Sequence, residues 1–221
     1  MEEIIRNISI WAVPVVFAIV LHEVSHGWVA DKLGDNTARF MGRLTLNPIK
    51  HIDPIGTILI PLLLLITTGY AIGYAKPVPV DFRKLRDPKR DMVWVALAGP
   101  VSNLLLAIAS AAILLLAVKM PDAWVWAAQP LALMARASII INLILCFFNL
   151  IPIPPLDGGR VAVGLLPGPL AWKLSRLEPY GFIIVIVGII VLNEFGILQG
   201  ILEVLISGSA NFLLNLLGTI L

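Results

Sequence analysis

Cysteine, histidine and charged side chains are all scarce in this sequence. It has one cysteine and three histidines in 221 residues, and 14% of its residues are charged. The lone Cys146 excludes an intramolecular disulfide framework and a zinc site built from several cysteines. Soluble domains are about 25% charged, so this composition, with a mean hydropathy of +0.94, is that of a membrane protein. The sequence has no basic patch with interleaved aromatic residues, which argues against a nucleic-acid partner.

Long apolar runs fill most of the chain. A helix needs ~20 apolar residues to cross ~30 Å of hydrocarbon, and five stretches qualify for consideration: 8–30, 54–75, 92–118, 123–156 and 179–221. We therefore predict an all-α polytopic membrane protein with about five to six transmembrane helices. We expect one integral-membrane domain over residues 1–221, with a core at 8–160 and C-terminal membrane segments at 179–221. No small-residue cleavage site follows the first run, so we expect that helix to be retained.

The positions of lysine and arginine predict the topology. Thirteen of the sixteen fall in three clusters, at 32–50, 76–90 and 160–176, and such clusters are typical of the cytoplasmic side. The first two clusters flank 54–75, so we predict that this segment re-enters the membrane, with Pro61, Gly69 and Gly73 breaking its helix. The alternative is an ordinary spanning helix. On this topology the N-terminus lies outside, and residues 199–221 either cross back or lie at the interface.

Two histidines and a glutamate lie inside the first apolar run. His22 and His26 are four residues apart, so a helix places both imidazoles on one face, with Glu23 beside them as a general base. Ionisable residues within a membrane span are costly and indicate a functional site. At ~1.5 Å per residue from Ile8, His22 lies ~21 Å from the outer surface, which places the site nearer the cytoplasmic face. The alternative is that these side chains mark the end of the helix.

Catalytic zinc commonly takes three protein ligands and leaves a fourth position to water. His51, between Lys50 and Asp53, and Cys146 are candidates for the third ligand, although each is also explained as an ordinary interfacial or packing residue. Asp157 is the stronger candidate, because it follows three prolines that cannot sustain a helix. It also precedes two glycines that allow a close backbone approach.

Three motifs together resemble the site-2 protease family of intramembrane zinc metalloproteases, in a short form without PDZ or CBS domains. They are LHEVSHGWVADKLG at 21–34, AGPVSN at 98–103 and FNLIPIPPLDGGR at 148–160. The resemblance covers roughly residues 8–160. It implies one Zn²⁺ per chain, held by His22, His26 and Asp157 and served by Glu23.

The same resemblance implies that the substrates are transmembrane proteins whose helices unwind at the metal. A β-like element at 40–46, which includes Gly42, would hold the unwound segment by strand addition. Asn149 and Pro152 match family positions near the active site, where an amide could bind substrate backbone or an oxyanion. Asn103 would either bridge helices or touch the substrate.

These observations predict an intramembrane zinc metalloendopeptidase in a bacterial or archaeal cell membrane, with the lipid bilayer and transmembrane proteins as partners. The alternatives are a metal transporter and a catalytically silent membrane scaffold. A transporter needs successive ligand sites across the bilayer, and no second cluster of His, Asp and Glu is evident in the apolar runs. A silent scaffold could dispense with Glu23, which is present.

Overall fold

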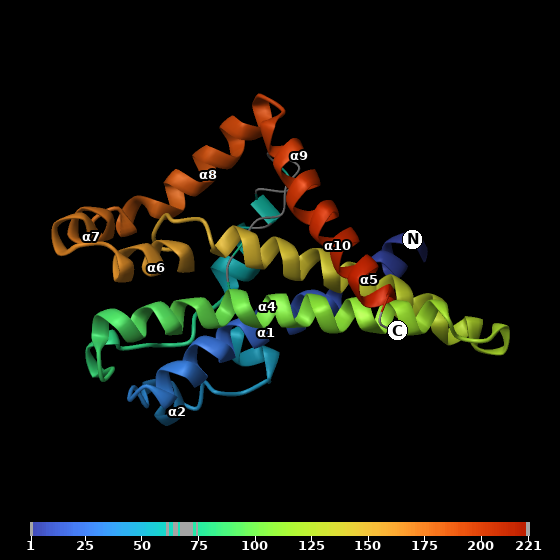
Figure 1. Ribbon diagram of the computed structural model, residues 1–221, viewed down its shortest axis with the longest axis horizontal. Helices are drawn as coiled ribbons and strands as arrows, with labels where there is room; N and C mark the ends of the chain where they lie inside the picture. The colour runs from blue at the N-terminus through green and yellow to red at the C-terminus, as the bar shows by residue number, and fades with distance from the viewer. Residues whose placement is uncertain (1, 61, 64–65, 67–72, 74, 220–221) are drawn as a thin grey trace.

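A computed structural model describes residues 2–60, 62–63, 66, 73 and 75–219 (Figure 1). Its long helices are α1 (Glu2–Lys32), α4 (Pro88–Val118), α5 (Val125–Asn149) and α8 (Glu178–Glu194). Its shorter α-helices are α2 (Thr37–Phe40), α6 (Asp157–Leu165), α7 (Gly168–Ser175), α9 (Ile197–Leu202) and α10 (Gly208–Gly218). The remaining elements are 3₁₀ or π turns: η1 (Pro48–His51), η2 (Pro54–Leu59), η3 (Phe82–Lys84), η4 (Asp122–Trp124) and η5 (Glu203–Ser207). The predicted all-α class is confirmed.

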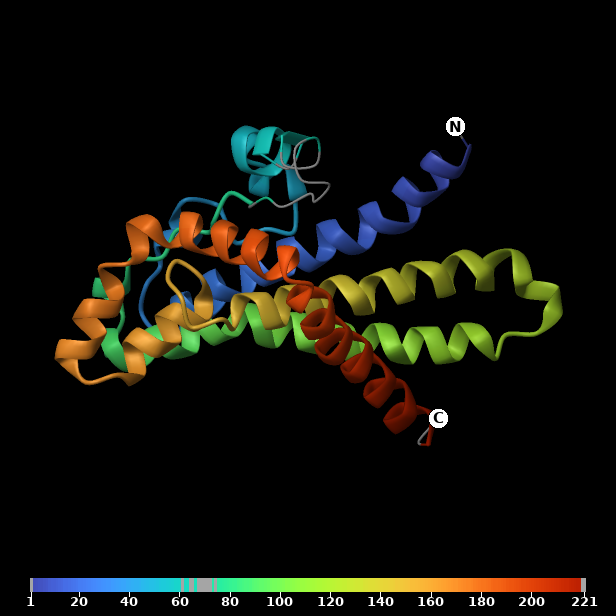
Figure 2. The ribbon, with the colours of Figure 1, turned by 90° about the horizontal axis from the view of Figure 1, so that it is seen from above.

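The helices α4 and α5 form a long antiparallel hairpin, and α1 packs against both (Figures 1 and 2). Asp87 begins α4 by accepting the Arg90 N–H, with Pro88 at the first helical position, where a missing N–H costs nothing. At the other end of the hairpin, α5 stops at Asn149, just before the run of prolines that cannot continue a helix. The sequence predicted that these prolines cannot sustain a helix, although the apolar run itself extends to residue 156.

Small residues line the contact between α4 and α5. Ala107 and Ala111 on α4 face Ala135 on α5 within one buried cluster, which Leu213 of α10 completes. Small side chains let helix backbones approach closely where lipid supplies no hydrophobic driving force. This packing gives a rigid frame on which α1 is held.

Among the described residues, four helices are long and apolar enough to cross a membrane: Ile5–Lys32, Pro88–Val118, Asp122–Asn149 and Ile197–Gly218. A fifth is possible if α7 and α8, which meet at 67°, act as one broken span. The count of four or five is at or below the lower end of the expected five to six. The C-terminal segment is one candidate span, because η5 joins α9 to α10.

The ends of the 54–75 segment meet. The Lys76 amide donates to the His51 carbonyl at 2.9 Å, so the chain enters and leaves this segment at the same place. Pro54–Leu59 forms the π-helical η2, capped by the Asp53 side chain. The predicted breaks at Pro61 and Gly69 lie outside the described residues.

The β-like element predicted at 40–46 is not confirmed. Phe40 is the last residue of α2, Gly42 lies in a turn with φ +61°, and residues 43–46 have no regular secondary structure. Instead of pairing with a strand, this loop is held by side chains. The Arg43 guanidinium donates to the carbonyls of Lys76 and Pro77 at 3.0 and 3.2 Å.

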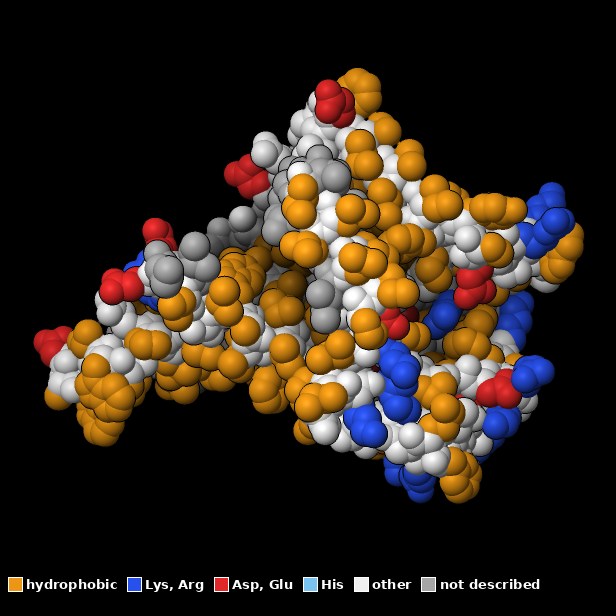
Figure 3. Space-filling view, turned by 180° about the vertical axis from the view of Figure 1, so that it is seen from behind, with side chains coloured by type: hydrophobic (Ala, Val, Ile, Leu, Met, Phe, Trp, Pro, Cys, Tyr) orange, Lys and Arg blue, Asp and Glu red, His pale blue; other side chains and the backbone are white. Residues whose placement is uncertain are grey.

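The three basic clusters lie at one end of the molecule, near α2, the start of α4 and α7 (Figure 3). Lys84 of the second cluster donates to Thr37 beside the first cluster, at 2.9 Å. Lys89 donates to the Leu166 carbonyl beside the third, at 2.7 Å. At this same end the Arg83 guanidinium, which donates to Asp81, lowers the pKa of that carboxyl. Many large apolar side chains are exposed along the long helices, among them Phe17, Leu105 and Ile183.

Candidate metal centre

His22, His26 and Asp157 come together between α1 and α6, buried at 7%, 9% and 6% exposure. His22 Nε2 and His26 Nε2 are 3.1 Å apart. Asp157 Oδ2 lies 3.2 Å from the first nitrogen and 3.3 Å from the second. Two potential ligand atoms from α1 and one from α6 thus form a nearly equilateral triangle.

The hydrogen bonds behind the imidazoles determine which nitrogen carries the proton. His22 Nδ1 is 2.6 Å from Asn103 Oδ1, and His26 Nδ1 is 2.7 Å from the Val95 carbonyl. Both partners are acceptors, so each Nδ1 donates and each neutral ring presents a bare lone pair at Nε2. Asp157 Oδ2 is buried and has no hydrogen-bond partner among the described residues. Three lone pairs therefore converge without a proton between them, which is an arrangement that a cation stabilises.

The size of the triangle fits zinc. In a tetrahedral site with metal–ligand distances of ~2.0–2.1 Å, the ligand atoms are ~3.3 Å apart. The observed separations are 3.1, 3.2 and 3.3 Å. Two imidazoles and one carboxylate are also a ligand set found in catalytic zinc sites that leave one position to water.

Glycines allow the elements of the site to approach one another. A Cβ on Gly99 of α4 would overlap the imidazoles of both His22 and His26. At the start of α6, a Cβ on Gly158 or Gly159 would overlap the backbone of the loop that follows α5. The predicted close approach at these two glycines is therefore found, and it carries Asp157 toward α1.

Glu23 lies beside the cluster on α1, and an extended loop covers it. Its Oε2 accepts the Val78 N–H at 2.8 Å. One turn further along, Gly27 is in contact with the side chains of Val78 and Leu44. The loops that bracket 54–75 thus lie against α1 next to the glutamate. No hydrogen bond to the other carboxylate oxygen occurs within the described part of the chain.

The two weaker ligand candidates lie elsewhere. His51 is buried, and its Nε2 contacts the Thr45 carbonyl at 2.9 Å. Its burial follows from the meeting of the two ends of the 54–75 segment. Cys146 is a buried free thiol on α5 and packs as expected. Neither belongs to the one group of His, Cys, Asp and Glu that could hold a metal in the described ranges.

The four predicted substrate-binding residues fall in different places. Asn103 is fully buried and contacts His22 rather than an open surface. Asn149 is half-buried and donates to the Leu145 carbonyl at 3.0 Å, which satisfies the end of α5. Pro152 is exposed in the loop before α6, and Gly42 is exposed in its turn. The geometry therefore assigns Asn103 to the support of a histidine.

Sequence reasoning missed the residues behind the histidines. The Val95 carbonyl and Gly99 are backbone features of α4 that no side-chain pattern reveals. Asn142 on α5, which contacts Asn103 at 2.8 Å, could have been found. It is an uncharged polar residue in an apolar span, and such residues commonly bond across helices.

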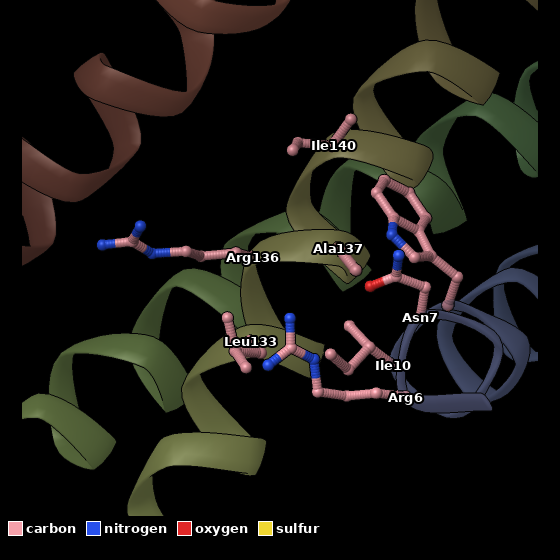
Figure 4. Close-up of a pocket in the computed structure, with 8 residues that line it drawn as sticks. Arg6, Asn7, Ile10, Leu133, Arg136, Ala137 and Ile140 are labelled. Carbon is pink, nitrogen blue, oxygen red and sulfur yellow. The ribbon is translucent and has the colours of Figure 1, made fainter. Parts of the chain in front are cut away.

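A cavity of about 360 Å³ lies elsewhere, between the first turns of α1 and the middle of α5. It is lined by Arg6, Asn7, Ile10, Trp11, Leu133, Arg136, Ala137 and Ile140. Figure 4 shows the Arg6 guanidinium between the two helices, while Arg136 extends from α5 away from α1. None of the clustered histidines or Asp157 lines this cavity, so it is separate from the candidate metal centre.

The chain belongs to Peptidase family M50, the site-2 protease family. The sequence model of this family matches residues 10–134 and 117–192. It is 43% identical over 179 residues to a Bacillus subtilis protein named "Putative zinc metalloprotease YwhC", covering 79% of this chain and 77% of that one. The resemblance drawn from the three motifs is thereby confirmed. Family and relative together support a membrane zinc metalloprotease.

Two mycobacterial proteins named "Putative zinc metalloprotease Rip2" are also similar. The one from Mycolicibacterium smegmatis is 27% identical over 173 residues, which are 78% of this chain and 63% of that protein. The one from Mycobacterium tuberculosis H37Rv is 32% identical over 143 residues, 64% of this chain and 51% of that protein. The chain thus spans less than two thirds of these longer relatives. No solved structure matches it.

Proposed function

We propose that this protein hydrolyses peptide bonds in or near the transmembrane segments of other membrane proteins, using zinc held by His22, His26 and Asp157. The observation that carries the proposal is the convergence of three proton-free ligand atoms, 3.1 to 3.3 Å apart. Such a buried set is costly in a membrane without a cation, and its spacing fits zinc.

Each residue of the candidate metal centre has a defined task in this mechanism. When bound, zinc supplies a water whose pKa is lowered to ~7 and polarises the scissile carbonyl. Glu23 would accept a proton from that water on the carboxylate oxygen that the Val78 amide does not occupy, and would later give it to the leaving amine. His22 and His26 would hold the metal through Nε2, because their Nδ1–H groups donate to Asn103 and to the Val95 carbonyl.

The site lies within a candidate membrane span, which favours membrane-embedded substrates. His22 is ten residues from Lys32, or ~15 Å along the helix, within the span Ile5–Lys32. The three basic clusters gather at the Lys32 end, and this asymmetry favours a cytoplasmic location for that end. We therefore place the site inside the bilayer, nearer the cytoplasmic face of a prokaryotic cell membrane.

We propose that the unwound substrate lies along the loops next to Glu23. Leu44 and Val78 contact α1 one turn beyond the glutamate. The backbone at and near Gly42 is therefore close enough to contact an extended substrate segment. Extended substrates gain affinity from backbone hydrogen bonds of this kind. Pro152 and Asn149 would border the site from the other side, in the segment leading to Asp157.

The alternatives find less support. Metal transport needs successive ligand sites across the bilayer, and the described residues contain one such group. A catalytically silent scaffold has no use for a carboxylate next to the ligands with one oxygen left to accept a proton. The same family membership supports hydrolysis over both.

The test is Glu23→Gln, assayed on a single-span model transmembrane substrate reconstituted with the enzyme, with zinc measured on the same samples. The substitution keeps the size of the side chain but removes the base, so hydrolysis should slow by at least ~10²–10⁴-fold. Zinc content should stay at that of the parent. The matched control is Glu203→Gln, an exposed glutamate of the C-terminal helix, which should cleave at the parental rate.

A Glu23→Gln protein that cuts as fast as the parent would refute this mechanism. Loss of zinc together with activity would give Glu23 a structural role and would also contradict its assignment as the base.

A further inference from the structure

A line of polar side chains crosses the interior behind His22. Asn103 of α4 and Asn142 of α5 are 0% and 1% exposed, and the Asn103 amide nitrogen donates to Asn142 Oδ1 at 2.8 Å. The Asn142 amide nitrogen in turn donates to the Ser138 carbonyl at 2.8 Å. Beyond it, the Ser110 hydroxyl bonds to the Ser138 hydroxyl at 2.7 Å.

The spacing of these residues makes the line possible. Asn103 and Ser110 are seven residues apart on one face of α4, and Ser138 and Asn142 are four apart on one face of α5. Because the helices are antiparallel, Asn103 meets Asn142 while Ser110 meets Ser138. The polar face of each helix is thus matched with that of the other.

The bonds have a direction that begins at the imidazole, because each residue donates to the next one along the line. Asn103 Nδ2 donates to both the Ala18 carbonyl and Asn142 Oδ1, at 3.2 and 2.8 Å. Its Oδ1 is therefore turned toward His22 Nδ1. If the amide flipped, its nitrogen would face Nδ1, and the ring would have to carry its proton at Nε2, inside the metal site.

We propose that Asn142 is a positioning residue, which acts through Asn103 to keep His22 Nε2 free of its proton and directed at the metal. The inference rests on the proposed function, since it takes His22 as a zinc ligand. Asn103 contacts the ligand His22 directly, and Asn142 contacts Asn103, so Asn142 is one residue further from the metal. Such supporting residues typically alter metal affinity by ~10–100-fold.

The experiment compares three variants in detergent-purified protein. Asn142→Leu keeps the approximate volume but removes the acceptor, and should weaken zinc binding by about 10-fold in a chelator competition. Asn142→Asp still offers an acceptor to Asn103 and should recover most of that loss. Ser110→Ala removes the hydrogen bond between the Ser110 and Ser138 hydroxyls, which is the bond furthest from His22, and should leave zinc affinity unchanged.

A second measurement separates positioning from packing. In zinc-free protein with labelled histidine, nitrogen NMR should report the Nδ1–H tautomer of His22 in the parent and a mixture in Asn142→Leu. An unchanged tautomer and zinc affinity in Asn142→Leu would overturn the proposal, and so would equal losses in Asn142→Leu and Ser110→Ala. If the parent itself bound no zinc, the proposed function would fail instead.

Discussion

Gly99→Ala should destroy the metal centre without disturbing the helix that carries it. Alanine is the better helix former by ~1 kcal/mol, so α4 itself gains from the change. The added methyl group, however, would lie 2.5 and 2.6 Å from the Cε1 and Nε2 atoms of His22, whereas ordinary contact starts at 3.4 Å. It would also overlap His26 Nε2.

The size of the effect follows from these distances. The His22 ring would have to retreat by about 0.9 Å for its Cε1 atom to reach ordinary contact, but zinc sites hold their ligand distances within ~0.2 Å. The imidazole cannot simply rotate, because Asn103 holds it from behind. We therefore expect zinc affinity to fall by about 100-fold or more, while overpacking costs the fold only ~1–3 kcal/mol.

The assay is a zinc dissociation constant from chelator competition, with thermal unfolding of the zinc-free protein followed in parallel. Gly188→Ala is the matched control, since it lies within α8 and a Cβ there meets nothing within 4 Å. The control should bind zinc like the parent. Parental zinc affinity in Gly99→Ala would refute the placement of both imidazoles against α4.

Two further predictions concern the ligand set and the topology. Asp157→Ala should lower bound zinc well below one equivalent, whereas His51→Ala should leave it unchanged, and metal analysis of both proteins checks this. A fully loaded Asp157→Ala protein would remove Asp157 from the ligands. Because the His51 carbonyl and the Lys76 amide are bonded at 2.9 Å, cysteines introduced near Lys50 and Lys84 should react with an impermeant reagent from the same side. Labelling from opposite sides would contradict re-entry of the 54–75 segment.

The sequence predicted most of what depends on local chemistry. Hydropathy located three of the candidate spans, near 8–30, 92–118 and 123–156, because crossing hydrocarbon requires about 20 apolar residues in a row. The spacing of His22 and His26 put two imidazoles on one face, since a helix repeats every ~3.6 residues. The prolines before Asp157 marked the end of α5, because a ring without an N–H cannot continue a helix.

Other expectations failed where distant contacts compete with local preference. The family resemblance implied a β-like element at 40–46, but Phe40 ends a helical turn, and Arg43 holds the loop by bonding to carbonyls more than thirty residues away. Within the C-terminal span, by contrast, Gly208 does not interrupt the helix, because η5 leads directly into α10. Glycine is tolerated in membrane helices, where the backbone has no water to bond with instead.

The sequence by itself determined the membrane class, the helical face that bears His22 and His26, and the presence of a carboxylate suited to join them. Only the tertiary structure brought Asp157 to 3.2 and 3.3 Å from the two imidazoles and set Asn103 and the Val95 carbonyl behind them. The physical reason is that ligand type and helical phase are properties of neighbouring residues. The distance between ligands and the tautomer of each ring instead depend on how α1, α4, α5 and α6 pack, which no local pattern encodes.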